Sequence, residues 1–112
     1  MSRRPTPEQA ALLSEQAVAD RLELDGWRIL GVNVRTRFGE LPIVARRGDM
    51  IVFVETTAPG QEVDARRRSR IRRMAIAWMA ANPSLQAGVN RYRFDVVSVR
   101  DGLPVQHVTD AF

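Results

Sequence analysis

Residues 39–57 read GELPIVARRGDMIVFVETT, and this stretch decides the fold. Two apolar runs flank Arg47-Gly48-Asp49, a composition typical of a tight turn. The second run, residues 50–54, is continuously apolar, which predicts a central strand covered on both faces. We therefore expect two neighbouring strands, at residues 40–46 and 50–54, in the middle of a sheet.

The residues before this stretch predict a helix and one more strand. Thr6-Pro7-Glu8-Gln9 is typical of a capped helix start, and Gly26 is typical of a helix end. We therefore expect the first helix to run to about Leu24. An apolar stripe broken by one carboxylate follows helical spacing: Leu12, Glu15, Val18 (or Ala19) and Leu22. Residues 27–34 are β-branched and mostly alternating, so they complete a three-stranded meander.

The residues after the stretch predict a second helix and two strands. Asp64 is a plausible N-cap, Asn82-Pro83 stops a helix, and five apolar residues between them share one face: Ile71, Met74, Ala75, Trp78 and Met79. Residues 92–99 and 104–108 are rich in strand formers. A strand, helix, strand order indicates a parallel pair, so the predicted class is α/β, with a mixed central sheet flanked by helices.

Length and composition restrict the class of protein. The chain has 112 residues, 45% of them hydrophobic and 27% charged, which fits one domain at residues 8–112 behind a flexible tail at residues 1–7. There is no cysteine, which excludes disulfides and thiolate metal sites. No apolar run approaches a membrane span and none follows the charged N-terminus as in a secretory signal, so we expect a cytoplasmic protein without membrane contact.

All 17 basic residues are arginine, and six of them fall within residues 66–73. Arginine suits phosphate because its planar guanidinium donates to two oxygens at once. The cluster predicts phosphate-backbone contact, above all through Arg66, Arg67, Arg70 and Arg73. Salt bridges to Glu62, Asp64 or another protomer, or a merely solvated face, are the alternatives. The absence of lysine has its own alternative explanation, a genome composition that favours arginine codons.

Several local strings resemble the YraN family, a bacterial group in the restriction-endonuclease-like, PD-(D/E)XK superfamily that is related to Holliday-junction-resolvase-type nucleases. The resemblance spans residues 14–112 and is carried by Ser14-Glu15-Gln16-Ala17-Val18-Ala19 with Leu22, Gly26-Trp27-Arg28-Ile29-Leu30, Asn33-Val34-Arg35, Arg37-Phe38-Gly39-Glu40-Leu41, Val52-Phe53-Val54-Glu55, Arg93-Phe94-Asp95-Val96-Val97 and His107-Val108-Thr109-Asp110-Ala111-Phe112. It implies a restriction-endonuclease-like core and a nuclease site in which two carboxylates share Mg²⁺ and a lysine steadies the attacking water.

The resemblance maps four site positions onto this chain, and two of them are changed. Glu15 and Glu55 match the family's acids, whereas Pro42 stands in place of the aspartate and Thr57 in place of the lysine. Proline has no ligand atom, and threonine cannot replace an ammonium that stabilises developing charge. Glu15 and Glu55 are thus catalytic remnants that bind metal weakly or not at all, and no cofactor is expected.

Other residues that often carry chemistry have structural interpretations. We expect Glu55 to be a partly buried acid paired with an arginine, and Glu40 to pair with Arg35 or Arg37. Trp27 and Trp78 lie on apolar stripes and are expected in the core. His107, the single histidine, is expected to be structural, and Asp95 to bond an arginine or the backbone at the end of the neighbouring strand.

These observations lead to three functional hypotheses. The first is a nuclease-fold protein, catalytically inactive, that binds nucleic acid weakly or acts as a scaffold through its arginine-rich helix; its partner would be DNA, branched DNA included. The second is a Mg²⁺-dependent DNA endonuclease that uses Glu15, Glu40 and Glu55 with an arginine in place of the lysine. The third is a protein–protein interaction module without nucleic-acid binding. Whether the chain is an enzyme stays open, although the lost groups favour an inactive protein, and a homodimer also stays open.

Overall fold

Residues 39–57 form two adjacent strands of a five-stranded mixed sheet in the computed structural model, which describes residues 3–112. The elements are α1 (Pro7–Leu24), β1 (Arg28–Thr36), β2 (Gly39–Arg47), β3 (Met50–Thr57), α2 (Ala65–Ala81), the short 3-10 helix η1 (Pro83–Gln86), β4 (Arg91–Arg100) and β5 (Leu103–Val108). This order confirms the prediction of a helix, a three-stranded meander, a helix and two strands. It matches the restriction-endonuclease-like topology.

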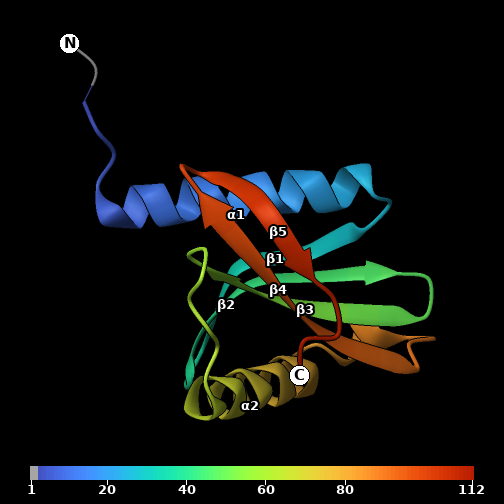
Figure 1. Cartoon of the computed structure of the whole chain (residues 1–112). Coiled ribbons are helices and arrows are strands. Elements are labelled where there is room, and N and C mark those ends of the chain that lie inside the picture. Colours follow the sequence, from blue (N-terminus) through green and yellow to red (C-terminus); the bar gives the residue numbers. More distant parts are fainter. Residues whose placement is uncertain (1–2) are drawn as a thin grey trace.

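The strands lie in the order β1-β2-β3-β4-β5, with α1 on one face and α2 on the other (Figure 1). Only β3 and β4 are parallel, because α2 carries the chain back between them. β3 reaches Thr57, three residues beyond the apolar run, since Glu55, Thr56 and Thr57 continue the pairing with β4. The end of β3 therefore presents polar side chains beside the first turn of α2.

The start of α1 follows from its capping residues. The Gln9 backbone N–H donates to the Thr6 hydroxyl at 3.2 Å, and the Gln9 side chain accepts from the Thr6 N–H at 2.9 Å. Pro7 is the first helical residue, as the sequence predicted, and residues 1–2 lie outside the described part of the chain. Leu12 was expected on the buried stripe but is 46% exposed, because the apolar cluster under α1 takes only Val18, Ala19 and Leu22 from the helix.

Two apolar clusters fill the space between the helices and the sheet. The cluster on the α1 side contains Val18 and Leu22 of the helix and Val54 of β3, and the cluster on the α2 side contains Phe53 of β3 with Ile71 and Trp78 of the helix. β3 contributes to both, as expected for a strand buried on both faces. Trp27 and Trp78 are 5% and 3% exposed, which confirms their core positions. Within residues 3–112, no helix combines the length and the apolar character that crossing a membrane requires.

Candidate functional site

Glu15 lies in the middle of α1 and is partly buried. Its Oε2 atom is buried and has no hydrogen-bond partner within the described chain. Burial, followed by the negative charges of Glu40 and Glu55, raises the pKa of Glu15 from 4.5 to about 7. The three carboxylates that the sequence distributes over α1, β2 and β3 are therefore close enough to repel one another.

Strands β1 and β2 exchange their two faces at Asn33 and Pro42. In a regular strand, residues two apart lie on one face, yet Leu41 packs on the α2 side and Ile43 on the α1 side. Val32 pairs with Ile43, and Val34 pairs with Leu41. Asn33, whose φ is 54°, therefore lies opposite Pro42. Because proline has no N–H to donate, this position cannot maintain the regular ladder.

This reversal determines where Glu40 lies. Glu40 is adjacent to Leu41, so it points away from α2 and toward the side of α1, where its charge acts on Glu15. Its carboxylate also lies 3.5 Å from the Arg35 guanidinium, as expected from the sequence. Both side chains are mostly exposed, at 85% and 52%, so this ion pair is weak.

Glu55 forms an ion pair with Arg67 in the first turn of α2, which confirms the expected acid–arginine pair. The Arg67 Nη2 atom lies 3.3 Å from Glu55 Oε1 and donates to the Thr56 carbonyl at 2.8 Å. The same carboxylate oxygen accepts from the Thr56 backbone N–H at 2.9 Å. Glu55 is 8% exposed, so its charge is balanced mainly by these protein groups.

Thr57, at the position of the family's lysine, forms hydrogen bonds to the loop that follows β3. Its hydroxyl lies 3.0 Å from Gln61 Oε1 and 3.2 Å from the Gln61 carbonyl, and the side chain is buried. A pocket of about 390 Å³ lies beside it and is lined by Ser14 of α1, Thr56 and Thr57 of β3 and Asp101 of the β4–β5 turn. Among residues 3–112, no basic side chain lines this pocket.

The residues at this end of the sheet do not fit a magnesium site. Mg²⁺ takes near-octahedral oxygen coordination, commonly with one or two carboxylates. Pro42 supplies no ligand atom, and one oxygen of Glu55 is already paired with Arg67. Across residues 3–112, no three side chains of histidine, cysteine, aspartate or glutamate gather in a way that could hold a metal ion. We therefore derive no metal-dependent step from this geometry.

Comparison with known proteins places the chain in a family. The model of an uncharacterised protein family, UPF0102, matches residues 14–99, which include Glu15, Pro42, Glu55 and Thr57. The chain belongs to the UPF0102 family. A UPF0102 protein of Rhizorhabdus wittichii is 37% identical over the whole chain and 98% of its own length. A Rhizobium etli relative is 41% identical over 90% of the chain and 86% of its length, and one from Parafrankia is 42% identical over 88% and 91%.

The arginines of α2 in this UPF0102 protein fall into three groups. Arg67 points inward to Glu55, and Arg68 and Arg72 place their guanidinium groups 5.6 and 5.5 Å from the centre of the Phe112 ring. Arg66, Arg70 and Arg73 are exposed and have no ion-pair or hydrogen-bond partner in residues 3–112. The sequence predicted one common phosphate-binding role for Arg67 and these three, and the structure separates Arg67 from them.

The sequence predicted that Glu55 pairs with an arginine, but it did not identify that arginine as Arg67. A usable signal was present, because Asp64 caps α2 through the Arg67 N–H and so fixes the first turn. That turn follows directly on the end of β3, where Glu55 lies. The sequence could not show that the Arg67 side chain turns toward β3 when the neighbouring arginines turn outward.

Asp95 is the second buried acid of this UPF0102 protein and lies on β4, fully buried. It accepts two hydrogen bonds from Arg93 at 2.8 Å, one from the Asp110 N–H at 3.0 Å, and contacts His107 Nε2 at 2.8 Å. Burial raises its pKa, but the bonds from His107, Arg93 and Asp110 outweigh this and leave the pKa below the usual 3.8. The ionised carboxylate therefore requires His107 Nε2 to carry the proton and donate it.

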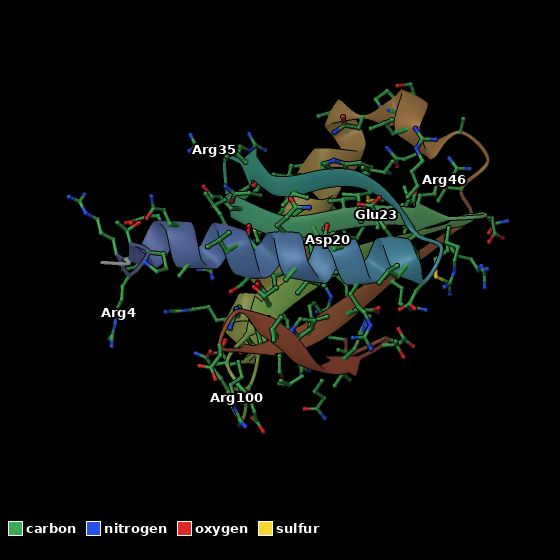
Figure 2. The ribbon with its side chains drawn as sticks, turned by 90° about the horizontal axis from the view of Figure 1, so that it is seen from above. Arg4, Asp20, Glu23, Arg35, Arg46 and Arg100 are labelled. Atoms are coloured by element: carbon green, nitrogen blue, oxygen red, sulfur yellow. The ribbon has the colours of Figure 1, made fainter. Side chains whose placement is uncertain are left out.

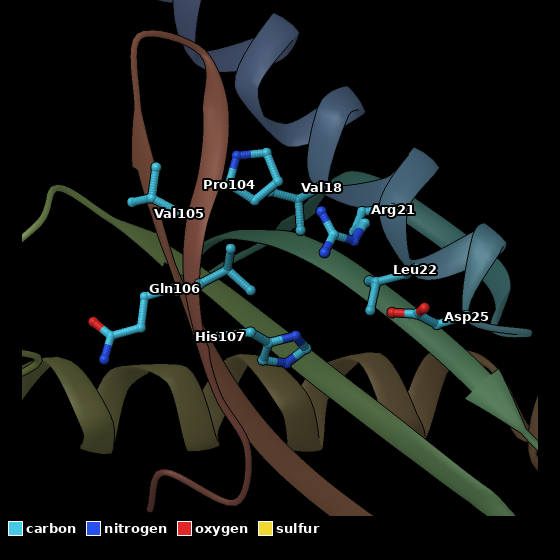
Figure 3. Close-up of a pocket in the computed structure, with 9 residues that line it drawn as sticks. Val18, Arg21, Leu22, Asp25, Pro104, Val105, Gln106 and His107 are labelled. Atoms are coloured by element: carbon cyan, nitrogen blue, oxygen red, sulfur yellow. The ribbon is translucent and has the colours of Figure 1, made fainter.

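His107 also lines a groove of about 210 Å³ between α1 and β5, with Val18, Leu22 and Pro104 (Figure 3). Its ring lies on the side of β5 that faces Leu22 and Asp25 of the α1 end. The Asp95 network thus ties β5 and the residues after it to β4. This geometry agrees with the structural role that the sequence predicted for His107 and Asp95.

Replacing Glu15 with glutamine is expected to stabilise the protein in alkaline solution. The folded state binds a proton at Glu15 up to about pH 7, whereas the unfolded state loses it near 4.5, so unfolding becomes easier as pH rises through this interval. After allowance for solvent screening, Glu15→Gln should raise the free energy of unfolding by about 1–2 kcal/mol at pH 8. The gain should disappear as pH falls below 4.5.

Urea denaturation of both proteins between acidic and alkaline pH measures this difference. Glu23→Gln provides a matched control, because Glu23 is exposed on the same helix (Figure 2). Parallel pH profiles for the wild type and Glu15→Gln would show that Glu15 is not held in an unfavourable environment.

Proposed function

We propose that this protein binds nucleic acid through α2, on a nuclease-like scaffold that no longer cleaves. The observation that carries the proposal is the row formed by Arg66, Arg70 and Arg73, which are exposed on one face of α2 and have no acidic partner in the described chain. Like charges at this spacing repel one another in the free helix. A polyanion such as the DNA backbone would relieve that repulsion and add charge-assisted hydrogen bonds.

The loss of cleavage rests on the other end of the sheet. A nuclease of this fold needs a metal held by paired carboxylates and a cation beside the attacking water. Here Pro42 is buried without a ligand atom, Thr57 bonds to Gln61, and the cation nearest Glu55 is engaged in an ion pair. Arg67 therefore supports the inactive hypothesis more than the active-enzyme alternative, since its guanidinium neutralises an acid that a metal would need.

The test is the salt dependence of DNA binding. If the three arginines each contact one phosphate, log affinity for duplex DNA should fall with log salt at a slope of about −3, from about −0.9 per contact. Replacing Arg66, Arg70 and Arg73 with glutamine should bring the slope near zero. Fluorescence anisotropy with a labelled duplex at several salt concentrations measures both affinity and slope.

A matched control carries the same loss of charge elsewhere. Arg21→Gln, Arg28→Gln and Arg100→Gln together also lower the net charge from +4 to +1, at exposed positions outside α2. This control should keep most of the slope. Equal losses of affinity and slope in the two triple variants would show that binding depends on net charge alone. Absence of DNA binding by the folded wild type would overturn the proposal and favour a protein–protein module.

A further inference from the structure

A groove of about 530 Å³ lies between the β1–β2 hairpin and the C-terminal half of α2. Val34, Arg35 and Arg37 line it from the hairpin, and Ala77, Ala80 and Ala81 line it from the helix. It lies on the side of the sheet covered by α2, away from Glu15 and the groove next to His107. Figure 2 shows Arg35 at the end of β1.

The hairpin is held in a defined shape against the helix. The Thr36 hydroxyl donates to the Gly39 carbonyl at 2.8 Å and accepts from the Phe38 N–H at 3.1 Å. Gly39 has φ of 136°, and a Cβ atom there would lie 3.1 Å from the Met74 sulfur of α2. The close approach that glycine permits keeps the hairpin near the helix, so the groove is present before any ligand binds.

The groove combines positive charge with a small apolar wall. The Arg37 guanidinium lies 4.8 Å from the centre of the Phe38 ring, which orients it and leaves its N–H donors free. The Arg35 guanidinium pairs with Glu40 on the face turned away from α2, so Arg37 is the cation that the hairpin offers to the groove. Within residues 3–112, no acidic residue lines the groove. A fitting ligand therefore carries negative charge for Arg37 and a flat apolar part for the alanines, as a nucleotide does.

The groove continues the row of free arginines along α2. Residues 66, 70, 73, 77 and 81 recur at steps of three and four, so they lie on one face of the helix. Ala77 lies about 6 Å beyond Arg73 along the helix axis. A strand whose phosphates follow Arg66, Arg70 and Arg73 would thus reach the groove next. Bases in a duplex are stacked and paired, so only an unpaired nucleotide can turn its base toward the alanines.

We propose that the groove binds an unpaired nucleotide of a strand that leaves a duplex held on α2, with its phosphate on Arg37 and its base against Ala77 and Ala81. This assignment rests on the proposed function, because the duplex is placed by Arg66, Arg70 and Arg73. With this groove, the protein recognises the junction between double-stranded and single-stranded nucleic acid.

The experiment compares a labelled blunt duplex, the same duplex with an oligothymidine tail, and oligothymidine alone, by fluorescence anisotropy. For the wild type, the tail should strengthen binding about tenfold, the effect of one charge-assisted hydrogen bond to a phosphate. Arg37→Gln should remove the advantage of the tail and leave the affinity for the blunt duplex nearly unchanged. Arg100→Gln, which removes one charge at an exposed position outside the groove, is the matched control and should retain the advantage.

A second variant tests the apolar wall without changing charge. Ala81→Leu fills the groove and should also abolish the advantage of the tail, whereas Ala65→Leu, an exposed position at the other end of α2, should not. Equal affinity of the wild type for blunt and tailed duplexes would overturn the groove assignment alone. An Ala81→Leu variant with the full advantage would overturn the base contact. Failure of all three oligonucleotides to bind would overturn the groove and the proposed function together.

Discussion

Replacing Trp78 with alanine is expected to lower the free energy of unfolding by about 3–5 kcal/mol. Trp78 is 3% exposed in the cluster between α2 and the sheet, and its ring meets Phe53 edge-on, with centroids 5.8 Å apart and planes at 79°. Alanine would leave a cavity that the rigid sheet cannot close. Since a domain of this size is stable by about 5–15 kcal/mol, the variant should unfold at a much lower temperature or fail to fold.

Thermal and urea unfolding followed by circular dichroism measure this loss. Ile76→Ala is the matched control, because Ile76 lies on the same helix but is 65% exposed, and its truncation should change stability by less than about 0.5 kcal/mol. A folded Trp78→Ala protein with an unchanged melting temperature and no DNA binding would instead make Trp78 a surface on which bases stack.

Replacing Asp95 with alanine should have a similarly large effect, a loss of about 3–5 kcal/mol. The carboxylate is fully buried and accepts from Arg93, His107 and the Asp110 N–H, so its removal leaves a largely buried guanidinium without its partner. The Arg93 guanidinium lies 5.4 Å from the centre of the Trp27 ring, so the disturbance would spread into the cluster on the α1 side.

The pH dependence separates this ion pair from simple loss of volume. The pKa of Asp95 is lowered in the folded state, so its stabilising contribution is present above the unfolded value of 3.8 and is lost as pH falls through the folded value. Asp95→Ala should therefore lose stability less steeply in acid than the wild type. Asp49→Ala, which removes the exposed partner of Arg91, is the control and should change stability little. A stable Asp95→Ala protein would show that the network is dispensable.

Local sequence signals were sufficient to predict the elements. The capping residues Thr6 and Asp64, the helical spacing of Ile71 and Trp78, and the turn at residues 47–49 each act through neighbours a few positions away. The spacing was less reliable at the ends, as exposed Leu12 shows, because burial there depends on whether the sheet extends beneath the helix. The α/β class and the parallel pair β3 and β4 followed from element order alone.

The candidate site was predictable only in its composition. The acids Glu15 and Glu55 and the changes at Pro42 and Thr57 are visible in the sequence, but their contacts are not. Regular alternation cannot predict that β1 and β2 exchange faces at Asn33 and Pro42, although that exchange places Glu40 near Glu15. The pairing of Arg67 with Glu55 likewise depends on how α2 docks onto the end of β3.

The sequence by itself determined the helices, the strands and their order along the chain, because each depends on residue type and short-range periodicity. The absence of lysine can be seen directly in the composition. The tertiary structure alone decided which arginines of α2 remain free, which acid is neutralised, and where a groove with Arg35 and Arg37 opens. The physical reason is distance along the chain. Contacts between Glu55 and Arg67, or between the hairpin and Ala77, depend on strand register, a local backbone reversal and helix docking, none of which has a periodic signature in the residues themselves.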